Sequence, residues 1–350
     1  MKKLLHKNNA AALLAILVLT VGSLAGCQPA SEKTSSGTSS LRIALFPNIT
    51  HAQGLVGKEN GDFQKAVGSN VKITWTSFNA GPDETQAFMA GSEDIGYIGP
   101  GPAISAYVQS HGDIQIIAGS TDAGELLVSR KGVAISSVKD LAGKKVGVPQ
   151  FGNTQHLTLL HLLKDNHLKP TTQGGTVEVV EANNSDVQSL FEKGQLDAAL
   201  VPEPWGSTLF QKAGATIVLD EKSIWRNGQY ATAVVIARKD YIDKHPDIVE
   251  NFLKAHVALT KYINQNPEKA EQAVNGQIQQ LTQKQLSSDI LAASFKRLSV
   301  VNDPAKSSVK DFYTFSKDAG YIKGSDSLSN LFNLTALNKV LKASGEKTIS

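Results

Sequence analysis

"FMAGSEDIGYIGP" (88–100) and "FEKGQLDAALVPEP" (191–204) follow the same pattern about 103 residues apart in the chain. Phe, Gly and Asp stand at identical offsets in both stretches, and each stretch ends in an apolar run followed by a proline-containing loop. A short apolar run bounded by turn residues is typical of a buried strand. Because the two stretches agree at several positions, we expect one structural unit to occur twice.

The segments upstream of the two stretches also correspond to each other. An apparent strand precedes each one, "VKITWTSFN" (71–79) and "VEVVEAN" (177–183). Further upstream, "LRIALFPNITHA" (41–52) and "KKVGVPQFGNTQHL" (144–157) both read as strand, proline, polar loop and helix. Alternating strands and helices favour parallel sheets covered on both faces. The sequence therefore predicts an α/β fold with two similar lobes. The chain is also longer than a single hydrophobic core normally holds, which favours two lobes.

Two further strands indicate how the lobes are joined. "GELLVSR" (124–130) leaves the first unit, and "ATAVVIAR" (231–238) follows the second. If both cross between the lobes, the first lobe is discontinuous and regains the helical C-terminal region. We expect lobe 1 to comprise residues 41–128 and 233–350, and lobe 2 to comprise 129–232, with two hinge strands between them.

The loops at the carboxyl ends of the parallel strands are the expected ligand site, since open parallel sheets bind ligands there. Helices begin directly after these loops, and helix N-termini attract anions through their unpaired N–H groups. Asn183 is interpreted as a turn residue. The candidate ligand-binding residues are Asn48, Thr50, His51, Asn79, Gly81, Gly99, Gly101, Gly152, Asn153, Thr154, Gln155, Glu203 and Trp205.

Several of these residues have a structural alternative. Thr50 and Thr154 suit helix N-caps, a role that can coexist with ligand contact. His51 suits a structural position at a helix start, and Trp205 suits either core packing or a pocket wall. Glu203 beside an anion would be costly, so it either pairs with a cation of the protein or meets an amino group of a zwitterionic ligand. We favour the pair within the protein.

The chemistry of these loops is mostly neutral. None of the short loops contains a lysine or an arginine, and their glycines allow the backbone to approach a ligand closely. Such a donor set suits a weakly basic anion, a sulfonate or a nitrate, better than a phosphate dianion.

The first 26 residues predict a secretory signal. Three lysines and no acidic residue lie in this segment, and residues 10–21 are almost wholly apolar. That run is shorter than the roughly 20 residues that span a bilayer, and its order of features is typical of a signal peptide. Leu24-Ala25-Gly26-Cys27 resembles the bacterial lipobox, in which cleavage leaves the cysteine as a lipidated N-terminus.

Cys27 is the chain's single cysteine, so no intramolecular disulfide is possible. A buried or free thiol is the alternative to a lipid anchor. The following residues, to Ser40, are rich in Ser, Thr and Gly and predict a flexible tether, so that 27–40 is expected to be anchor and tether. Without residues 1–26 the chain has 32 basic and 32 acidic residues, and this balance predicts no nucleic-acid partner.

Six segments of the chain carry a resemblance to a known family. They are "PNITHA" (47–52), "FNAGP" (78–82), "DIGYIGPGPAI" (94–104), "GNTQ" (152–155), "GQLDAALVPEPW" (194–205) and "HPDIVENFLKAH" (245–256). With them the chain resembles ABC-transporter substrate-binding proteins for aliphatic sulfonates, in the wider nitrate, sulfonate and taurine class, from Leu41 to about Lys317. The resemblance implies a two-lobed periplasmic-binding-protein fold of type II, a permease with its ATPase as partners, and a monomer lipid-anchored on the outer face of the membrane.

Other functions remain open beside this one. Nitrate, taurine and thiamine-precursor binders share the architecture, and a ligand sensor would use the same lobes. An enzyme is disfavoured because the chain has no G-x-S-x-G, H-E-x-x-H or G-x-x-x-x-G-K-[ST] motif. His156 and His161 are five residues apart, which does not place two metal ligands on one helix face. We expect no catalytic residue, no cofactor and no metal.

Overall fold

The computed structural model describes residues 39–324 and 326–350. The predicted signal peptide and Cys27 lie outside the described residues, as does all of the predicted tether except Ser39 and Ser40. These two serines already belong to the first strand, in which Ser39 is paired with Val71. Strand β1 therefore begins two residues before Leu41.

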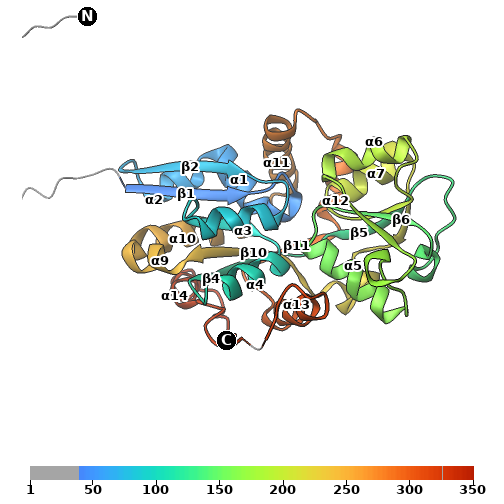
Figure 1. Ribbon diagram of the computed structural model, residues 1–350. Coiled ribbons are helices and arrows are strands. Elements are labelled where there is room, and N and C mark those ends of the chain that lie inside the picture. Colours follow the sequence, from blue (N-terminus) through green and yellow to red (C-terminus); the bar gives the residue numbers. More distant parts are fainter. Residues whose placement is uncertain (1–38, 325) are drawn as a thin grey trace, which may run out of the picture. The chain divides into compact units, whose positions relative to one another are not determined.

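We call the six-stranded sheet and the helices packed on it the first lobe (Figure 1). Its elements come from both ends of the described chain. The N-terminal elements are β1 (Ser39–Leu45), η1 (Ile49–His51), α1 (Ala52–Asn60), α2 (Asp62–Val67), β2 (Val71–Ser77), α3 (Gly81–Met89), β3 (Ile95–Ile98), α4 (Pro100–Gln109) and β4 (Ile114–Ala123). The C-terminal elements are β10 (Ala231–Arg238), α9 (Lys239–Lys244), α10 (Pro246–Gln265), α11 (Pro267–Thr282), β11 (Leu298–Val300), α13 (Lys306–Asp318) and α14 (Thr335–Ala343).

We call the five-stranded sheet and its helices the second lobe. It is formed by one continuous part of the chain. Its elements are β5 (Glu125–Ser129), η2 (Val138–Leu141), β6 (Lys145–Val148), α5 (Thr154–Asp165), η3 (Thr171–Gln173), β7 (Glu178–Glu181), η4 (Asn184–Asp186), α6 (Val187–Glu192), β8 (Ala198–Pro202), α7 (Trp205–Ala213), β9 (Thr216–Leu219), α8 (Glu221–Ile224) and η5 (Arg226–Gly228).

The two sheets repeat one strand arrangement, as the sequence repeat predicts. Their orders are β11-β4-β10-β3-β1-β2 and β7-β6-β8-β5-β9. In each sheet the three strands of the repeated unit are parallel, β2-β1-β3 in one and β7-β6-β8 in the other. The strands that adjoin these units, β10 and β5, are antiparallel to β3 and β8 respectively. The predicted α/β class with two sheets is confirmed, but the sheets are mixed rather than wholly parallel.

The antiparallel strands follow from the crossings between the lobes. The strands of the repeated unit end at the side that faces the other lobe. A strand that has just arrived from that lobe starts at this side and must run the opposite way. The chain crosses from β4 to β5 through Gly124, whose φ of 81° belongs to the left-handed region that glycine tolerates best. It returns through residues 227–230 into β10.

Each sheet is covered on both faces by apolar layers. On the first sheet, Leu41 and Ile43 pack with α1, α2 and α10, whereas Ala44 packs with α3, α4 and α13. The second sheet has two smaller layers of the same kind, one toward α5 and one toward α6 and α7. Alternate strand residues therefore supply opposite layers of the core.

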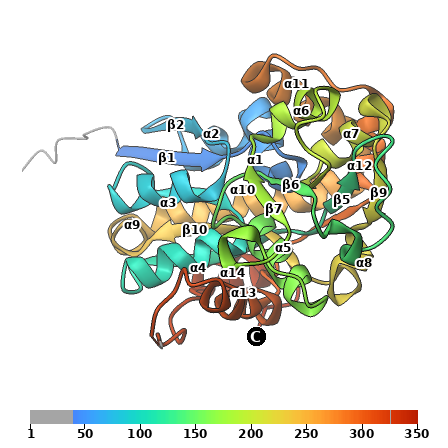
Figure 2. The same cartoon turned by 45° about the vertical axis from the view of Figure 1, so that its right-hand side comes forward.

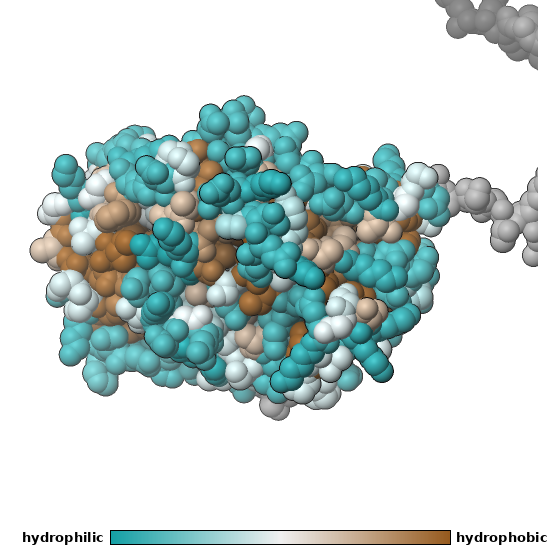
Figure 3. All heavy atoms as spheres, turned by 180° about the vertical axis from the view of Figure 1, so that it is seen from behind, coloured by the Kyte–Doolittle hydropathy of each residue, from teal (hydrophilic) through white to brown (hydrophobic). Residues whose placement is uncertain are grey.

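The face seen from behind is largely hydrophilic, with apolar residues gathered toward the left of the view (Figure 3).

A C-terminal connection also reaches the second lobe. We call residues 283–287, between α11 and α12 (Ser288–Phe295), the crossing segment. Helix α11 packs on α1 of the first lobe, while α12 packs on α7 of the second. Helices α6, α7, α11 and α12 lie on the same side of the molecule in both views (Figures 1 and 2). The chain then returns to the first sheet through β11, which pairs with β4.

Candidate functional site

A small polar cavity lies between the two lobes, at the carboxyl ends of the parallel strands. Its volume is about 20 Å³, enough for roughly one water molecule. We call it the anion cavity. The first lobe contributes Phe46, Asn48, Thr50, His51, Asn79, Ala80, Gly81, Gly99, Pro102 and Thr232, and the second contributes Pro149, Asn153, Thr154, Gln155, Asn184 and Pro202.

Four helices start at the anion cavity. Asn48, Ala80, Gly99 and Asn153 precede the first residues of η1, α3, α4 and α5, and all four have extended backbone angles. Only Asn153 caps its own helix, by accepting a hydrogen bond from the His156 N–H at 2.9 Å. The first N–H groups of a helix have no partner within it and carry the positive end of its dipole. The site is therefore electropositive without any charged side chain among its lining residues.

His51 is a neutral hydrogen-bond donor in this cavity. Its Nδ1 accepts a hydrogen bond from the backbone N–H of Phe46 at 3.0 Å, which assigns the ring proton to Nε2. Complete burial lowers the pKa of His51 to about 3, so the ring is uncharged at neutral pH. His51 therefore has the structural role expected at a helix start, and it also lines the anion cavity.

Gln155 is held by two neighbours. Its Oε1 accepts from the Asn153 side-chain amide at 3.0 Å, and its Nε2 donates to Oε1 of Glu125 at 2.7 Å. Glu125 is fully buried at the start of β5, behind the lining residues, and burial raises the pKa of its carboxyl to about 7. One of the two Nε2 hydrogens of Gln155 is used at Glu125, and the second is free to serve the cavity.

Two polar lining residues were not predicted from the sequence. Asn184 and Thr232 are both buried, and among the described residues Oδ1 of Asn184 and Oγ1 of Thr232 have no hydrogen-bond partner. A buried polar atom is normally hydrogen-bonded, and at the wall of this cavity a bound water or ligand can supply the partner. Asn183, interpreted as a turn residue, precedes η4, and its neighbour Asn184 lines the cavity. Thr232 is the only polar residue in the run 231–237, and this isolated polar position is the sequence signal for it.

Four predicted site residues do not line the anion cavity. Gly101 lies one step behind it, where its N–H donates to Oγ1 of Thr154 at 3.3 Å. Gly152 has a φ of 80° and donates its N–H to Nδ1 of His156 at 3.0 Å. The other two are Glu203 and Trp205.

Glu203 has its partners within the protein. The carboxylate is fully buried, accepts hydrogen bonds from Ser207 and Ser294, and lies 3.4 Å from Nε of Arg297. Desolvation raises its pKa, and the serine hydrogen bonds and Arg297 oppose this effect. Glu203 thus pairs with Arg297, a cation of the protein, as we favoured over a pairing with an amino group of a ligand. Ser294 and Arg297 lie in and just after α12, so the pair fixes the C-terminal connection to the second lobe.

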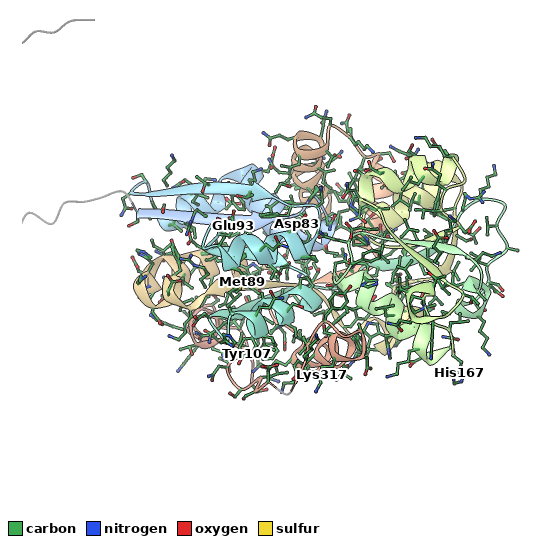
Figure 4. All side chains as sticks on the ribbon, in the orientation of Figure 1. Asp83, Met89, Glu93, Tyr107, His167 and Lys317 are labelled. Atoms are coloured by element: carbon green, nitrogen blue, oxygen red, sulfur yellow. The ribbon has the colours of Figure 1, made fainter. Side chains whose placement is uncertain are left out.

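The lobes touch each other directly around the anion cavity. The Ile49 N–H donates to the Glu203 carbonyl at 3.0 Å, and the Trp205 indole N–H donates to Oδ1 of Asn48 at 2.8 Å. At the rim, Gln150 of the second lobe donates to Oδ1 of Asp83 at 2.9 Å. Asp83 lies at the end of the first lobe that adjoins the second (Figure 4). These contacts describe a closed cleft.

Close contact at Gly99 depends on its missing side chain. A Cβ at this position would lie 2.0 Å from Oγ1 of Thr154, on the opposite lobe. The φ of Gly99 is −71°, which any residue adopts. Space across the cleft, and not backbone conformation, therefore requires glycine here.

No group of three or more His, Cys, Asp or Glu side chains within residues 39–324 and 326–350 is arranged to hold a metal ion.

Comparison with known proteins identifies similar chains. A family model described as the NMT1-like family matches residues 34–276. The taurine-binding periplasmic protein of Escherichia coli (strain K12) is 30% identical over 214 residues, which cover 61% of this chain and 63% of that protein. The match therefore spans less than two thirds of the relative's length.

Solved structures share the fold at low sequence identity. The alkanesulfonate-binding protein from Xanthomonas axonopodis pv. citri, bound to MOPS, superposes with a TM-score of 0.71 at 17% identity, over 85% of this chain and 99% of that one. The nitrate-binding protein from Synechocystis PCC 6803 gives a TM-score of 0.70 at 13% identity, over 87% and 89% of the two chains. These likenesses show the fold, which confirms the expected periplasmic-binding-protein architecture.

Proposed function

This chain belongs to the NMT1-like family, and from that premise we propose that it is the extracytoplasmic solute-binding component of an ABC importer. It captures a small organic anion, an aliphatic sulfonate, between its lobes and delivers it to a membrane permease driven by an ATPase. The names of a taurine-binding relative and of an alkanesulfonate-binding structural neighbour support this proposal. The curated relatives that match are named as binding proteins, not as enzymes.

The observation that carries the proposal is the neutral donor set at four converging helix starts. None of the described residues that line the anion cavity is a Lys, Arg, Asp or Glu. A sulfonate spreads one negative charge over three weakly basic oxygens, so it needs several donors and no ion pair. Helix N-termini and the neutral His51 ring provide such donors. A phosphate dianion would leave more of its charge uncompensated in the same place.

We assign the ligand contacts to the predicted residues that line the anion cavity, together with Asn184 and Thr232. Gly101 and Gly152 hold Thr154 and His156 in place, and Glu203 and Trp205 hold the lobes together. Release of the ligand requires the lobes to part by a hinge motion at residues 123–125 and 227–231. The sequence predicts lobe bounds of 41–128 with 233–350, and 129–232; with the crossings at Gly124 and at residues 227–230, we propose that all of β5 belongs to lobe 2 and all of β10 to lobe 1.

Nitrate is the second candidate because the anion cavity is small. In this closed form a cavity of about 20 Å³ holds about one water molecule, so either anion requires its lining to move apart, and the compact nitrate requires less of this movement. A nitrate-binding protein also shares the fold. Nitrate has no tail, whereas Asn184 of the anion cavity also lines a second, larger cavity. We therefore place the sulfonate first.

We further propose that lipidated Cys27 anchors the protein to the outer face of the cell membrane as a monomer. Among residues 39–324 and 326–350, no helix is both long and apolar enough to cross a bilayer. Two acyl chains or a second signal are needed for stable attachment. The full-length protein should partition into the membrane fraction, whereas Cys27→Ala should release it or block its maturation. A Cys27→Ala protein that remains fully membrane-bound would contradict the anchor.

Thermal unfolding of the purified protein against a ligand panel tests the function. The panel contains taurine, ethanesulfonate, propane-1-sulfonate, nitrate, sulfate and a thiamine-precursor pyrimidine. A ligand at about a thousand times its dissociation constant adds roughly 4 kcal/mol to the stability, which raises the unfolding midpoint by several degrees. A shift with sulfonates supports the proposal. A shift with nitrate or the pyrimidine alone overturns the substrate class. Growth on an alkanesulfonate as sole sulfur source, lost on deletion of the gene, separates import from sensing.

A further inference from the structure

A second cavity adjoins the anion cavity on the second lobe. Its volume is about 200 Å³, somewhat more than the roughly 150 Å³ of an engineered protein cavity that holds benzene. We call it the tail chamber. Its lining residues are Asn184, Ser185, Gln188, Trp205, Thr208, Leu209, Lys212, Lys284, Gln285 and Leu286.

Asn184 lines both the tail chamber and the anion cavity, so the two cavities lie on either side of this residue. The residue is buried, and its Oδ1 has no hydrogen-bond partner among the described residues. A buried, unpartnered amide oxygen at a common wall is costly unless a ligand or water meets it. A ligand that meets Asn184 from the anion cavity would therefore have its far end directed toward the tail chamber.

Two separate parts of the chain build the tail chamber. η4, α6 and α7 form one side, and the crossing segment forms the other. The crossing segment is fixed at both ends: Lys284 Nζ donates to the Ser185 carbonyl at 2.5 Å, and Leu286 exchanges two hydrogen bonds of 3.0 Å with the side chain of Asn275. Helices α6, α7, α11 and α12 lie on the same side of the molecule (Figure 2), and α12 contacts both α11 and α7. The tail chamber is thus a built feature of the closed molecule.

The walls combine apolar surface with positive charge. Trp205, Leu209 and Leu286 are buried. The indole N–H of Trp205 is already used at Asn48, so Trp205 offers the chamber an apolar ring. Lys212 and Lys284 are the charged residues of the lining, which contains no Asp or Glu among the described residues. Such a wall is complementary to a short hydrocarbon chain that ends in an anion.

We propose that the tail chamber receives the far end of the substrate, and that this end carries a second anionic group, which makes the preferred substrate a sulfonate with a terminal carboxylate or second sulfonate. This inference rests on the proposed function, because the anion cavity must hold the first sulfonate. The hydrocarbon link passes Asn184 and lies against Trp205 and Leu209. The terminal anion meets the Lys212 ammonium and the free protons of the Lys284 ammonium.

Paired ligands of equal chain length test the inference on the full-length protein. Propane-1-sulfonate and 3-sulfopropanoate both have three carbons, and the second ends in a carboxylate. Calorimetric titration at low salt should show 3-sulfopropanoate binding at least about tenfold more tightly. Because Lys212 and Lys284 are exposed to solvent, this preference should fall as ionic strength rises.

Lys212→Met tests the assigned cation while keeping the length of the side chain. The preference for 3-sulfopropanoate should fall about three- to tenfold, with little change for propane-1-sulfonate. Lys139→Met, an exposed position on η2, is the matched control and should leave both affinities unchanged. Lys284→Met should act as Lys212→Met does, and thermal unfolding would show that each variant is folded.

The outcomes separate the two proposals. Binding of ethanesulfonate and propane-1-sulfonate without a preference for 3-sulfopropanoate keeps the proposed function and overturns the tail chamber. A preference that survives both lysine substitutions overturns the assigned cations and the chamber with them. Failure of every sulfonate overturns the proposed function, and the inference falls with it.

Discussion

The indole N–H of Trp205 donates a hydrogen bond of 2.8 Å to the side-chain oxygen of Asn48, across the two lobes. Asn48 precedes the first helix start at the anion cavity, and Trp205 is the first residue of α7. Both residues are buried. This bond exists only when the lobes are together, so its free energy contributes to closure and thereby to ligand affinity.

Trp205→Phe should therefore weaken ligand binding with a smaller effect on the fold. The ring is largely retained and one buried hydrogen bond is lost, which costs about 1 kcal/mol, or roughly fivefold in affinity. Titration of ethanesulfonate measures the change. Trp225→Phe is the control because Nε1 of Trp225 has no hydrogen-bond partner among the described residues. Equal losses of affinity in both variants would contradict the role of the Trp205 bond.

Gly99→Ala should prevent closure. The added Cβ would meet Oγ1 of Thr154 at 2.0 Å, a distance that atoms do not adopt, so the lobes must stay apart. We expect at least a tenfold loss of affinity with little change in unfolding free energy, because the backbone at Gly99 is unstrained. Small-angle scattering should show that ligand no longer compacts the variant.

Gly132→Ala provides the opposite case. A Cβ at this position would have no atom within 4 Å, but the φ of 80° strains any residue other than glycine. It should lose about 1 kcal/mol of stability and keep its affinity. If Gly99→Ala binds as the wild type does, the closed contact between Gly99 and Thr154 is not needed for binding.

Glu125→Gln should stabilise the protein in a pH-dependent way. Burial raises the pKa of Glu125 from 4.5 to about 7, against the opposing hydrogen bond from Gln155. Between these two values the unfolded chain is ionised at this residue while the folded chain holds the proton, so stability falls as pH rises through this window. The variant stays neutral and keeps an acceptor for Gln155. It should match the wild type near pH 4 and exceed it by up to about 3 kcal/mol at pH 8.

Urea unfolding of the two proteins at pH 4.5, 6 and 8 measures that difference. A stability difference that stays constant with pH would show that Glu125 does not titrate as its burial requires.

Arg297→Met should destabilise the protein by about 3 kcal/mol at neutral pH, because it leaves the buried Glu203 carboxylate without its cation. The double variant Glu203→Gln/Arg297→Met removes the charge as well and should recover part of the loss. Chemical unfolding of the wild type, Glu203→Gln, Arg297→Met and the double variant completes a double-mutant cycle. Full additivity of the two substitutions would show that Glu203 and Arg297 do not interact.

The repeated units were predictable from the sequence because residues 88–100 and 191–204 have the same local pattern, and local pattern decides strands and helices. Most of the anion cavity could be predicted for the same reason: Asn48, Asn79 and Asn153 each follow a strand and precede a helix. The antiparallel direction of β5 and β10 was harder to predict from the sequence, because strand direction depends on where the chain re-enters a sheet.

What the sequence could not supply comes from contacts between distant segments. Asn184 and Thr232 are ordinary residues locally, and their importance appears only when both lobes meet. The pairing of Glu203 with Arg297 joins residues far apart in the chain. The tail chamber is likewise formed by α7 and the crossing segment, which no local pattern relates.

A crystal structure of the protein grown with 2-bromoethanesulfonate tests the central claim most directly, because the bromine can be located by anomalous scattering. We predict the sulfonate in the anion cavity, among the helix starts at Asn48, Gly99 and Thr154, and the bromine directed past Asn184 toward Trp205. A ligand bound elsewhere, or crystals that hold none at saturating concentration, would contradict the assignment of this cavity to a sulfonate.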